Sequence, residues 1–366
     1  MKHTFKPLLT FLVIVTLLIC IGFIFIYSSS SAYALDRYQD GLFYVKKQFL
    51  GLMLGLMGGT VLALVPLQTL KRAAPWLFIA SLIATGATLL PTIGLSVHGS
   101  HRWLNIGGFS LQPSEFLKIS YILYCAYYLD KKQFTLHSLK HYAQLLCVLG
   151  ITAAVLLAQP DFGQMVTLSI TAVLLFFLAR VPVRYLAFTA VPVLPLLALL
   201  VYLKPYRFQR ILIYQDPWKD PQGAGFQIIQ SLIAIGSGNW FGVGVAGSKQ
   251  KFFYLPMHHT DFIFSIIAEE TGFLGISCLI ALYTFFLIIG FKLAAATKEL
   301  FSFLCIAGIT ILVTLQTIIN IGVACALLPT KGIGLPFISY GASSLLAHVC
   351  TVGIVINCVR TSKATR

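Results

Sequence analysis

Charged residues are scarce in this 366-residue chain, and acidic residues are the scarcest of them. Only 10% of the residues are charged, with 11 acids against 26 bases, whereas 58% are hydrophobic. A soluble domain carries roughly 25% charged residues. The composition therefore excludes an ordinary soluble globular protein and predicts an integral membrane protein.

The sequence also lacks the spacings that mark metal–thiolate sites. Its eight cysteines include no CxxC pair and no Cys/His ligand pattern. Disulfides and zinc-type sites are therefore not expected, and the cysteines are interpreted as small buried hydrophobic residues. The net charge of +15 comes from basic residues scattered among apolar runs. That distribution favours a role in membrane orientation over nucleic-acid binding.

Long apolar runs recur along the whole chain, and each comes near the roughly 20 residues that a helix needs to cross the hydrocarbon core. The sequence therefore predicts an all-α polytopic membrane protein with about ten transmembrane helices, in one membrane domain covering residues 1–366. The first run exceeds the about 7–15 apolar residues of a signal peptide, so we expect it to be retained. The predicted spans are 8–27, 48–66, 74–93, 113–129, 141–158, 163–180, 183–203, 260–290, 300–326 and 337–358.

Alternate connections between these spans carry many basic residues. Only Asp130 and Glu299 are acidic in the same segments. The positive-inside rule therefore places these connections and both termini in the cytoplasm. The basic residues concerned are Lys2, Lys6, Lys71, Arg72, Lys131, Lys132, Lys140, Arg180, Arg184, Lys292, Lys298, Arg360, Lys363 and Arg366.

One long polar stretch, residues 204–258, separates the seventh and eighth predicted spans. Loops longer than about 12–15 residues are usually functional or disordered, and the aromatic and aliphatic content here argues against disorder. The topology makes this loop extracytoplasmic. Within it, residues 225–235 are predicted to form an interfacial helix on the outer leaflet, with Gln227, Gln230, Ser231 and Ala234 on one face and Phe226, Ile229 and Ile233 on the opposite face.

Ionisable residues near the outer ends of the spans are candidates for chemistry, because such groups are costly inside a membrane. Gln112-Pro113-Ser114-Glu115 predicts a helix start, with proline in the first turn and the acid near the positive helix end. Lys118 shares a face with Glu115 and lies roughly 8 Å into that helix. It needs a partner, for which Glu115, Asp261 and Glu269 are the candidates. A purely structural ion pair is the alternative interpretation.

Asp261 lies where the polar stretch meets the eighth span, directly after His259 and Thr260. A carboxylate there would face both outer water and an intramembrane cavity, which suits catalysis or ligand contact. Capping of the following helix is the alternative. Glu269 lies about 12 Å deeper along the span and is either a direct participant or a paired structural group.

Two further candidates lie on outer connections. Asp161 stands between Pro160 and Gly163, where ordinary turn chemistry is the alternative to a functional role. Arg102 and Trp103 combine a cation with an interfacial aromatic residue. Together the candidates predict one outer mouth with a carboxylate, cations and aromatics beside lipid. That suits an anionic lipid-linked substrate, with cations holding phosphate and a carboxylate acting as base.

Several motifs follow one another along nearly the whole chain. They are Arg102-Trp103-Leu104 with Gly107, Gln112-Pro113-Ser114-Glu115 with Lys118, Pro160-Asp161-Phe162-Gly163, Asp216-Pro217, Tyr254-Leu255-Pro256, His259-Thr260-Asp261-Phe262, Glu269-Glu270 and Leu335-Pro336-Phe337-Ile338-Ser339-Tyr340-Gly341. In this order they resemble the SEDS family (shape, elongation, division and sporulation), the FtsW, RodA and SpoVE polymerases of bacterial peptidoglycan. Residues 251–256 are similar to the FtsW/SpoVE branch, whereas Gln159 is more similar to RodA.

The resemblance implies a peptidoglycan glycosyltransferase in the bacterial cytoplasmic (inner) membrane. It would polymerise lipid II, a disaccharide-pentapeptide on undecaprenyl pyrophosphate, at the outer face for septal wall synthesis. Asp261 would be the essential carboxylate and the general base of an inverting transfer, and Trp103 would be functionally important. The basic residues hypothesised to hold pyrophosphate are Arg102, Lys118, Arg207 and Arg210, and the further substrate-binding candidates are Glu115, Asp161, His259 and Glu269.

The pyrophosphate charge would be countered by these basic residues or by a divalent cation, Mg²⁺ or Mn²⁺. No organic cofactor is expected. The resemblance also implies a class B penicillin-binding protein transpeptidase and other division proteins as partners. Two other functions stay open, a lipid II flippase or scramblase and a non-catalytic division scaffold. The acids cluster toward the outer half of the spans, which favours outer-leaflet chemistry over transport.

Overall fold

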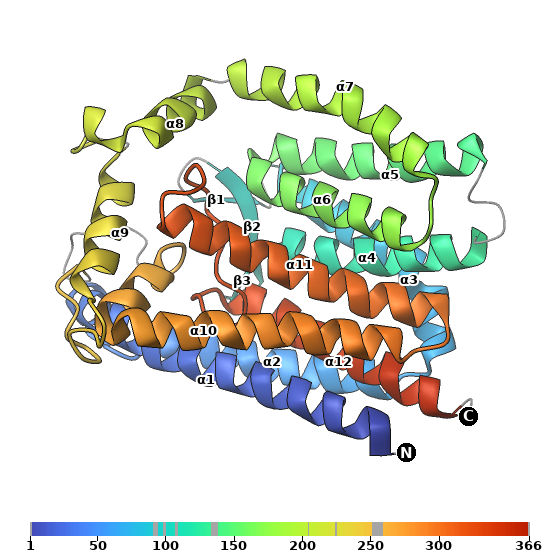
Figure 1. Ribbon diagram of the computed structural model, residues 1–366, viewed down its shortest axis with the longest axis horizontal. Helices are drawn as coiled ribbons and strands as arrows, with labels where there is room; N and C mark the ends of the chain where they lie inside the picture. Colours follow the sequence, from blue (N-terminus) through green and yellow to red (C-terminus); the bar gives the residue numbers. More distant parts are fainter. Residues whose placement is uncertain are drawn as a thin grey trace.

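The computed structural model describes residues 2–90, 94–97, 100–106, 109–132, 138–203, 205–223, 225–250 and 259–364. These residues form twelve α-helices and three short strands. Ten of the helices are long and run back and forth along one direction, whereas α9 lies crosswise at one end of the bundle (Figure 1). The bundle therefore has two ends, with many exposed apolar side chains on the helices between them.

Each long helix coincides, in chain order, with one of the predicted spans. The long helices are α1 (Lys2–Tyr38), α2 (Phe43–Leu64), α3 (Leu67–Ala87), α4 (Pro113–Lys132), α5 (Leu139–Ala158), α6 (Phe162–Leu178), α7 (Val183–Tyr202), α10 (Ile263–Ala295), α11 (Leu300–Ala324) and α12 (Ala342–Ala364). Six of them, α1, α2, α5, α10, α11 and α12, are long and apolar enough to cross a membrane by length and composition. The prediction of a helical polytopic membrane protein is confirmed, while the number of spans stays a prediction.

Helix ends differ from the predicted spans because hydropathy marks only the apolar part of a helix. The first helix continues through polar residues to Tyr38, and α3 begins at Leu67 rather than at residue 74. The eighth span is not one regular helix. Gly272 has φ 65° and ψ −166°, which breaks α10 into two parts. A positive φ of this kind is a conformation that glycine adopts at little cost.

A small antiparallel sheet, absent from the all-α prediction, lies between α3 and α4. Its strands are β1 (Gly94–Val97), β2 (Ser100–Ile106) and β3 (Phe109–Leu111), in the order β1-β2-β3. Ser343 at the start of α12 donates from Oγ to the Ser110 carbonyl at 2.8 Å. The sheet is therefore attached to the last helix, although its strands are too short to show a clear sequence pattern.

Both termini lie at the same end of the bundle, together with the connections α2–α3, α4–α5, α6–α7 and α10–α11 (Figure 1). These are the connections in which the basic residues concentrate, so their predicted grouping is confirmed. At this end Lys71 of α3 forms an ion pair with Asp130 of α4 at 2.5 Å. The opposite end carries the sheet, α8 (Pro205–Gln215), α9 (Phe226–Ser237) and the α11–α12 connection.

The predicted helix over residues 225–235 is present as α9, whereas its interfacial position stays a prediction and part of its predicted polar face is wrong. Ser231 and Ala234 are buried, whereas Leu232 and Ile233 are exposed. Ser231 Oγ donates to the Ala324 carbonyl at 2.7 Å and shares a hydrogen bond with Ser265 Oγ. Small residues face inward because they let the backbone of α9 come close to α10 and α11.

The cysteines are less uniformly buried than predicted. Cys20, Cys147 and Cys278 are exposed on the outside of the bundle, and Cys325 is half-buried. A small apolar side chain is as well accommodated by lipid as by the protein interior, so hydropathy alone cannot assign it to one of them. The buried cysteines are Cys125, Cys305, Cys350 and Cys358.

A stripe of glycines on α2 packs against α12, as small residues do at close helix contacts. Gly51, Gly55 and Gly59 are all buried. A Cβ atom on Gly51 would lie 2.6 Å from the Ala342 carbonyl oxygen, and one on Gly353 would lie 2.1 Å from the Gly59 oxygen. The spacing of these glycines at every fourth residue predicts close helix packing, and the contacts confirm it, since the stripe holds α12 directly against α2.

We expect Gly51→Ala to destabilise the protein by about 1–3 kcal/mol, because the new methyl group overlaps the backbone of α12. Gly150→Ala in α5 is the matched control, since a Cβ atom there would have no atom within 4 Å. Its effect should be neutral or stabilising by up to about 1 kcal/mol. Thermal denaturation in detergent measures both, and equal midpoints for the two variants would contradict the packing role.

Candidate active site

Asp261 lies in a short turn at the end of the bundle opposite the termini, directly before α10. The next three residues, Phe262, Ile263 and Phe264, are almost fully buried and begin the helix in the core. Asp261 itself stays half-buried. The local sequence thus anchors the chain immediately after Asp261.

The carboxyl group faces Gly332 in the α11–α12 connection. A Cβ atom at Gly332 would lie 3.1 Å from Asp261 Oδ2, so only glycine leaves the carboxylate this much room. Among the described residues, Asp261 forms no ion pair within 4 Å. Burial raises the pKa of Asp261 to about 7, and the more distant charges of Arg210 and Arg102 only partly oppose that rise. Near neutral pH, Asp261 can therefore accept a proton.

Arg102 of β2 joins the sheet to the turn between α5 and α6. It donates from Nε to the Gln159 carbonyl at 3.1 Å and from Nη2 to the Pro160 carbonyl at 2.7 Å. Its Nη1 lies 3.4 Å from Asp161 Oδ2. Asp161 is 3% exposed and accepts a hydrogen bond from the backbone N–H of Gln164, which caps α6. Burial raises the pKa of Asp161, and Arg102 opposes the rise.

Glu115 and Lys118 form a buried ion pair inside the bundle. As predicted, α4 begins at Pro113, and Lys118 Nζ lies 2.9 Å from Glu115 Oε1. Glu115 also accepts hydrogen bonds from Gln164 Nε2 of α6 at 3.1 Å and from Ser344 Oγ of α12 at 3.3 Å. The hypothesis that Lys118 pairs with Asp261 is wrong, because the neighbour one helical turn away already neutralises it.

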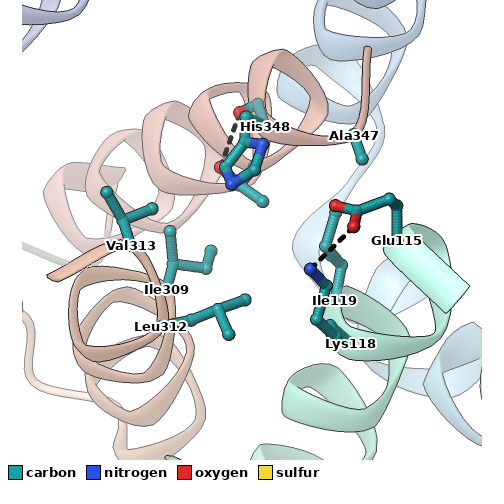
Figure 2. Close-up of a pocket in the computed structure, with 9 residues that line it drawn as sticks. Glu115, Lys118, Ile119, Ile309, Leu312, Val313, Ala347 and His348 are labelled. Carbon is teal, nitrogen blue, oxygen red and sulfur yellow. Dashed lines mark hydrogen bonds and ion pairs between the residues drawn. The ribbon is translucent and has the colours of Figure 1, made fainter. Parts of the chain in front are cut away.

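A pocket surrounds this pair, between α4, α11 and α12 (Figure 2). His348 faces Glu115 and Lys118 across it, while Ile309, Leu312 and Val313 of α11 close the apolar side. A chain of contacts connects the pocket to the end of the bundle, since Gln164 binds both Glu115 and Asp161. The Glu115–Lys118 pair is therefore linked, through Gln164, to the polar residues at the end of the bundle.

The Glu269 side chain forms hydrogen bonds with the polar loop. Its carboxylate accepts from the Lys249 N–H at 2.9 Å and from Ser248 Oγ, while Glu270 accepts from Ser28 Oγ of α1 at 2.7 Å. The backbone N–H of Val243 donates to the Glu269 carbonyl, next to the break in α10. The structure thus places Glu269 where it fixes the loop, at a distance along α10 from Asp261.

The remaining candidates occupy different surroundings. The His259 ring packs between Tyr44 and Tyr340, with centroid distances of 4.8 and 5.7 Å. Trp103 follows Arg102 in β2, and consecutive strand residues point to opposite faces. The pairing of β2 with β1 is irregular at Arg102, however, since Trp103 pairs with Leu95 and His101 with Ser96, so this alternation does not fix the direction of Trp103. Arg210 of α8 donates from Nη1 to the Thr330 carbonyl at 2.7 Å.

Some predicted features lie outside the described residues. They are Lys204, Gly107 and the segment 251–258 with its Tyr254-Leu255-Pro256 motif. Arg207 belongs to α8, but its side chain also lies outside the described part.

The sequence analysis missed the contribution of the α11–α12 connection, residues 325–341. Lys331 lies beside Gly332 and places Nζ 4.2 Å from the centroid of the Phe162 ring. Asn320 of α11 donates from Nδ2 to the Asp261 carbonyl at 2.7 Å. The motif 335–341 marked this region through its family resemblance, but nothing in the sequence connected it with Asp261.

These features define a class, namely a polytopic helical membrane protein with a polar, carboxylate-containing site at one end of its bundle. Within that class the chain belongs to the FTSW_RODA_SPOVE family, described as "Cell cycle protein", whose sequence profile matches residues 8–364. The family resemblance found in the motifs is thereby confirmed.

Known relatives are similar over nearly their full length. The chain is 43% identical over 336 residues to "Probable peptidoglycan glycosyltransferase FtsW" of Saccharophagus degradans, covering 91% of this chain and 87% of the relative. It is 36% identical to "Stage V sporulation protein E" of Bacillus subtilis, covering 98% of both. A solved structure described as "Structural coordination of polymerization and crosslinking by a peptidoglycan synthase complex" matches with a TM-score of 0.80 and 30% identity, covering 96% of this chain and 97% of that one.

We expect Lys118→Met to destabilise the protein strongly and to lower its activity. Removing one partner of a buried ion pair costs about 3–5 kcal/mol, because the remaining charge stays buried. Lys131→Met is the control, since Lys131 is exposed at the opposite end of the same helix. Thermal denaturation and activity of equal folded amounts measure both effects. Equal results for the two variants would remove Lys118 from the supporting network.

Proposed function

We propose that this protein is a peptidoglycan glycosyltransferase that polymerises lipid II into glycan strands, in the service of septal wall synthesis. The names of the relatives support the reaction class and the division role. The observation that carries the proposal is Asp261. It is a half-buried residue whose carboxyl group has a pKa near neutrality, at an end of the bundle that also carries Arg102, Arg210 and Lys331.

The chemistry requires one base and a stabilised leaving group. Asp261 accepts the proton of the acceptor sugar's 4-hydroxyl as that oxygen attacks the anomeric carbon of the other chain. The new glycosidic bond forms while the bond to pyrophosphate breaks, and an α-linked donor becomes a β-linked product. Pyrophosphate leaves with the bonding electron pair, so positive charge near it lowers the barrier.

The cations at this end of the molecule differ in how well they could stabilise the leaving pyrophosphate. Arg102 donates hydrogen bonds to the Gln159 and Pro160 carbonyls and pairs with Asp161. It would therefore act on the leaving pyrophosphate mainly through its long-range charge. Arg210 uses one nitrogen for the Thr330 carbonyl. Lys331 places Nζ 4.2 Å from the centroid of the Phe162 ring and adds a further positive charge to this end. Lys118 is too deep and too tightly paired to share this role.

A divalent cation is a further proposal for the leaving group. The described residues contain no group of three His, Cys, Asp or Glu side chains that could hold a metal ion. Mg²⁺ commonly takes one or two carboxylates and completes its ligands with substrate phosphate oxygens and water. Asp261 would be the carboxylate ligand at the site, and the pyrophosphate would supply the other ligands.

The setting we propose is the bacterial cytoplasmic membrane, with both termini in the cytoplasm. The concentration of basic residues at the terminal end supports this orientation. It places Asp261 and residues 204–258 at the outer face. A class B penicillin-binding protein transpeptidase is the proposed partner, because the similar solved structure concerns a complex that coordinates polymerization and crosslinking.

We expect Asp261→Asn to abolish glycan synthesis from purified lipid II, because the amide cannot accept the proton. The assay contains the full-length protein with its transpeptidase partner and measures polymer length on gels. Asp36→Asn is the control, because Asp36 is an exposed carboxylate at the same end of the bundle. It should retain wild-type activity.

The same assay separates the competing functions. Normal chain growth by Asp261→Asn would refute the base assignment. Movement of lipid II across vesicles without any polymer from the wild type would favour a flippase. Repeating the assay in EDTA and after adding Mg²⁺ or Mn²⁺ tests the cation. Full activity in EDTA would exclude a required divalent ion.

We expect kcat/KM to rise with pH and to level off above about 7, the pKa of Asp261. The base must be ionised to act, so below that value the rate should fall about tenfold per pH unit. The profile is measured as polymerisation rates from about two pH units below this pKa to about two units above it. A rate independent of pH across neutrality would contradict the assignment of Asp261 as the base.

A further inference from the structure

The backbone that carries Asp261 is held by three consecutive hydrogen bonds from the end of the chain. The His259 carbonyl accepts from the Tyr340 N–H at 3.0 Å, and the Thr260 carbonyl accepts from Ser339 Oγ at 2.6 Å. The Asp261 carbonyl accepts from Asn320 Nδ2 at 2.7 Å. A turn cannot satisfy all its own carbonyls, so partners from elsewhere decide where it sits.

Asn320 makes a second contact that gives it a special position. The same Nδ2 donates to the Ile333 carbonyl at 2.8 Å. Ile333 follows Gly332, the residue that the Asp261 carboxylate faces. One amide nitrogen therefore joins the backbone of the carboxylate to the segment opposite it. Asn320 is 2% exposed, and its Oδ1 has no hydrogen-bond partner among the residues that the structure describes.

We infer that Asn320 is a positioning residue for Asp261, which sets the place of the carboxylate relative to the α11–α12 connection. This inference rests on the proposed function for the role of Asp261. A primary amide carries two N–H donors on one nitrogen, which matches two carbonyl acceptors. Aspartate would place oxygen against both carbonyls, and alanine would leave two buried acceptors without partners.

The α11–α12 connection that holds the backbone of Asp261 is itself bonded to the helix bundle. Ser339 Oγ accepts from the Leu335 N–H at 2.7 Å while it donates to Thr260. Gln48 of α2 accepts from the Gly341 N–H at 3.0 Å and donates to the Ser339 carbonyl at 3.3 Å. The connection is thus fixed to the glycine-packed α2–α12 pair. Loss of the Asn320 hydrogen bonds would therefore let Asp261 move relative to a connection that keeps its own place.

The chain contains a matched control for this test. Asn357 of α12 is 0% exposed, and its Nδ2 donates to the carbonyls of Leu62 and Val65, both at 2.7 Å. The residue type, the burial and the double-donor contact are the same as at Asn320. Asn357 lies at the terminal end of the bundle, so its loss costs similar hydrogen bonds without touching Asp261.

The first experiment compares Asn320→Ala with Asn357→Ala in the full-length protein with its transpeptidase partner, using lipid II as substrate. We expect similar falls in thermal midpoint but a kcat that is about 100-fold lower only for Asn320→Ala, since a misplacement of about 1 Å can cost that much. KM should change little. Asn320→Gln, which keeps both donors, should recover part of the rate, whereas Asn320→Asp should recover none.

The second experiment is independent of activity and follows thermal midpoint against pH. The charges that act on Asp261 are Arg210 of α8, Arg102 of β2 and Asp161 before α6. The pKa of folded Asp261, about 7, exceeds its ordinary value of about 4. Its contribution to stability is therefore present at low pH and lost as pH rises through 7.

The difference in thermal midpoint between the wild type and Asp261→Asn, followed against pH, isolates the contribution of the Asp261 carboxyl group. In the Asn320→Ala background the same difference should move to lower pH, because a released carboxyl group gains water. In the Asn357→Ala background it should stay near 7. If Asn320→Ala does not fold, Ser339→Ala replaces it, with a smaller shift in the same direction and restoration by Ser339→Thr.

Two outcomes would overturn the inference. One is a folded Asn320→Ala variant with wild-type kcat and an unmoved titration step. The other is an equal loss of kcat in Asn320→Ala and Asn357→Ala, which would mean general destabilisation. A wild-type protein that makes no polymer would instead refute the proposed function, and the titration step would still decide the role of Asn320.

Discussion

The structure depends on one constraint, that a charge removed from water needs a partner. Most buried acids in this bundle meet it directly: Glu115 pairs with Lys118, Asp161 with Arg102, and Glu269 binds the Ser248–Lys249 backbone and hydroxyl. Among the described residues, the cations that act on Asp261 are the more distant Arg210 and Arg102, and burial therefore raises its pKa to about 7. The same rule separates these carboxylates, which have close partners, from Asp261, which has no ion pair within 4 Å among the described residues.

That carboxylate depends on parts of the chain far from it in sequence. The break at Gly272 lets the polar loop bind beside α10, and the glycine stripe of α2 holds α12 in place. On this framework the α11–α12 connection reaches back to residues 259–261. The sheet attaches Arg102 to the same end through the α5–α6 turn. The site is thus assembled from several separate regions, none of which could position Asp261 alone.

Much of the architecture was predictable because a membrane requires apolar helices of a set length and favours basic residues in the connections on one side. Apolar runs of membrane-crossing length located every long helix, and the basic connections identified which ends lie together. The Gly51–Gly55–Gly59 spacing predicted close packing without naming α12 as the partner. Predictions failed where small residues decided the outcome: Ser231 and Ala234 turned inward on α9, Cys20 turned outward, and the short strands around Arg102 gave no periodic signal.

The sequence by itself determined the class of protein and the family, and it singled out Asp261 as the candidate base, because composition and local motifs are written in consecutive residues. Tertiary structure alone decided which charges neutralise each other and which do not. Lys118 had three possible partners in the sequence, and Asn320 had no visible connection with Asp261, 59 residues away. The energies of burial and pairing depend on distances through space, which a linear pattern does not contain. The chemistry of Asp261 is therefore set by residues that its own motif does not include.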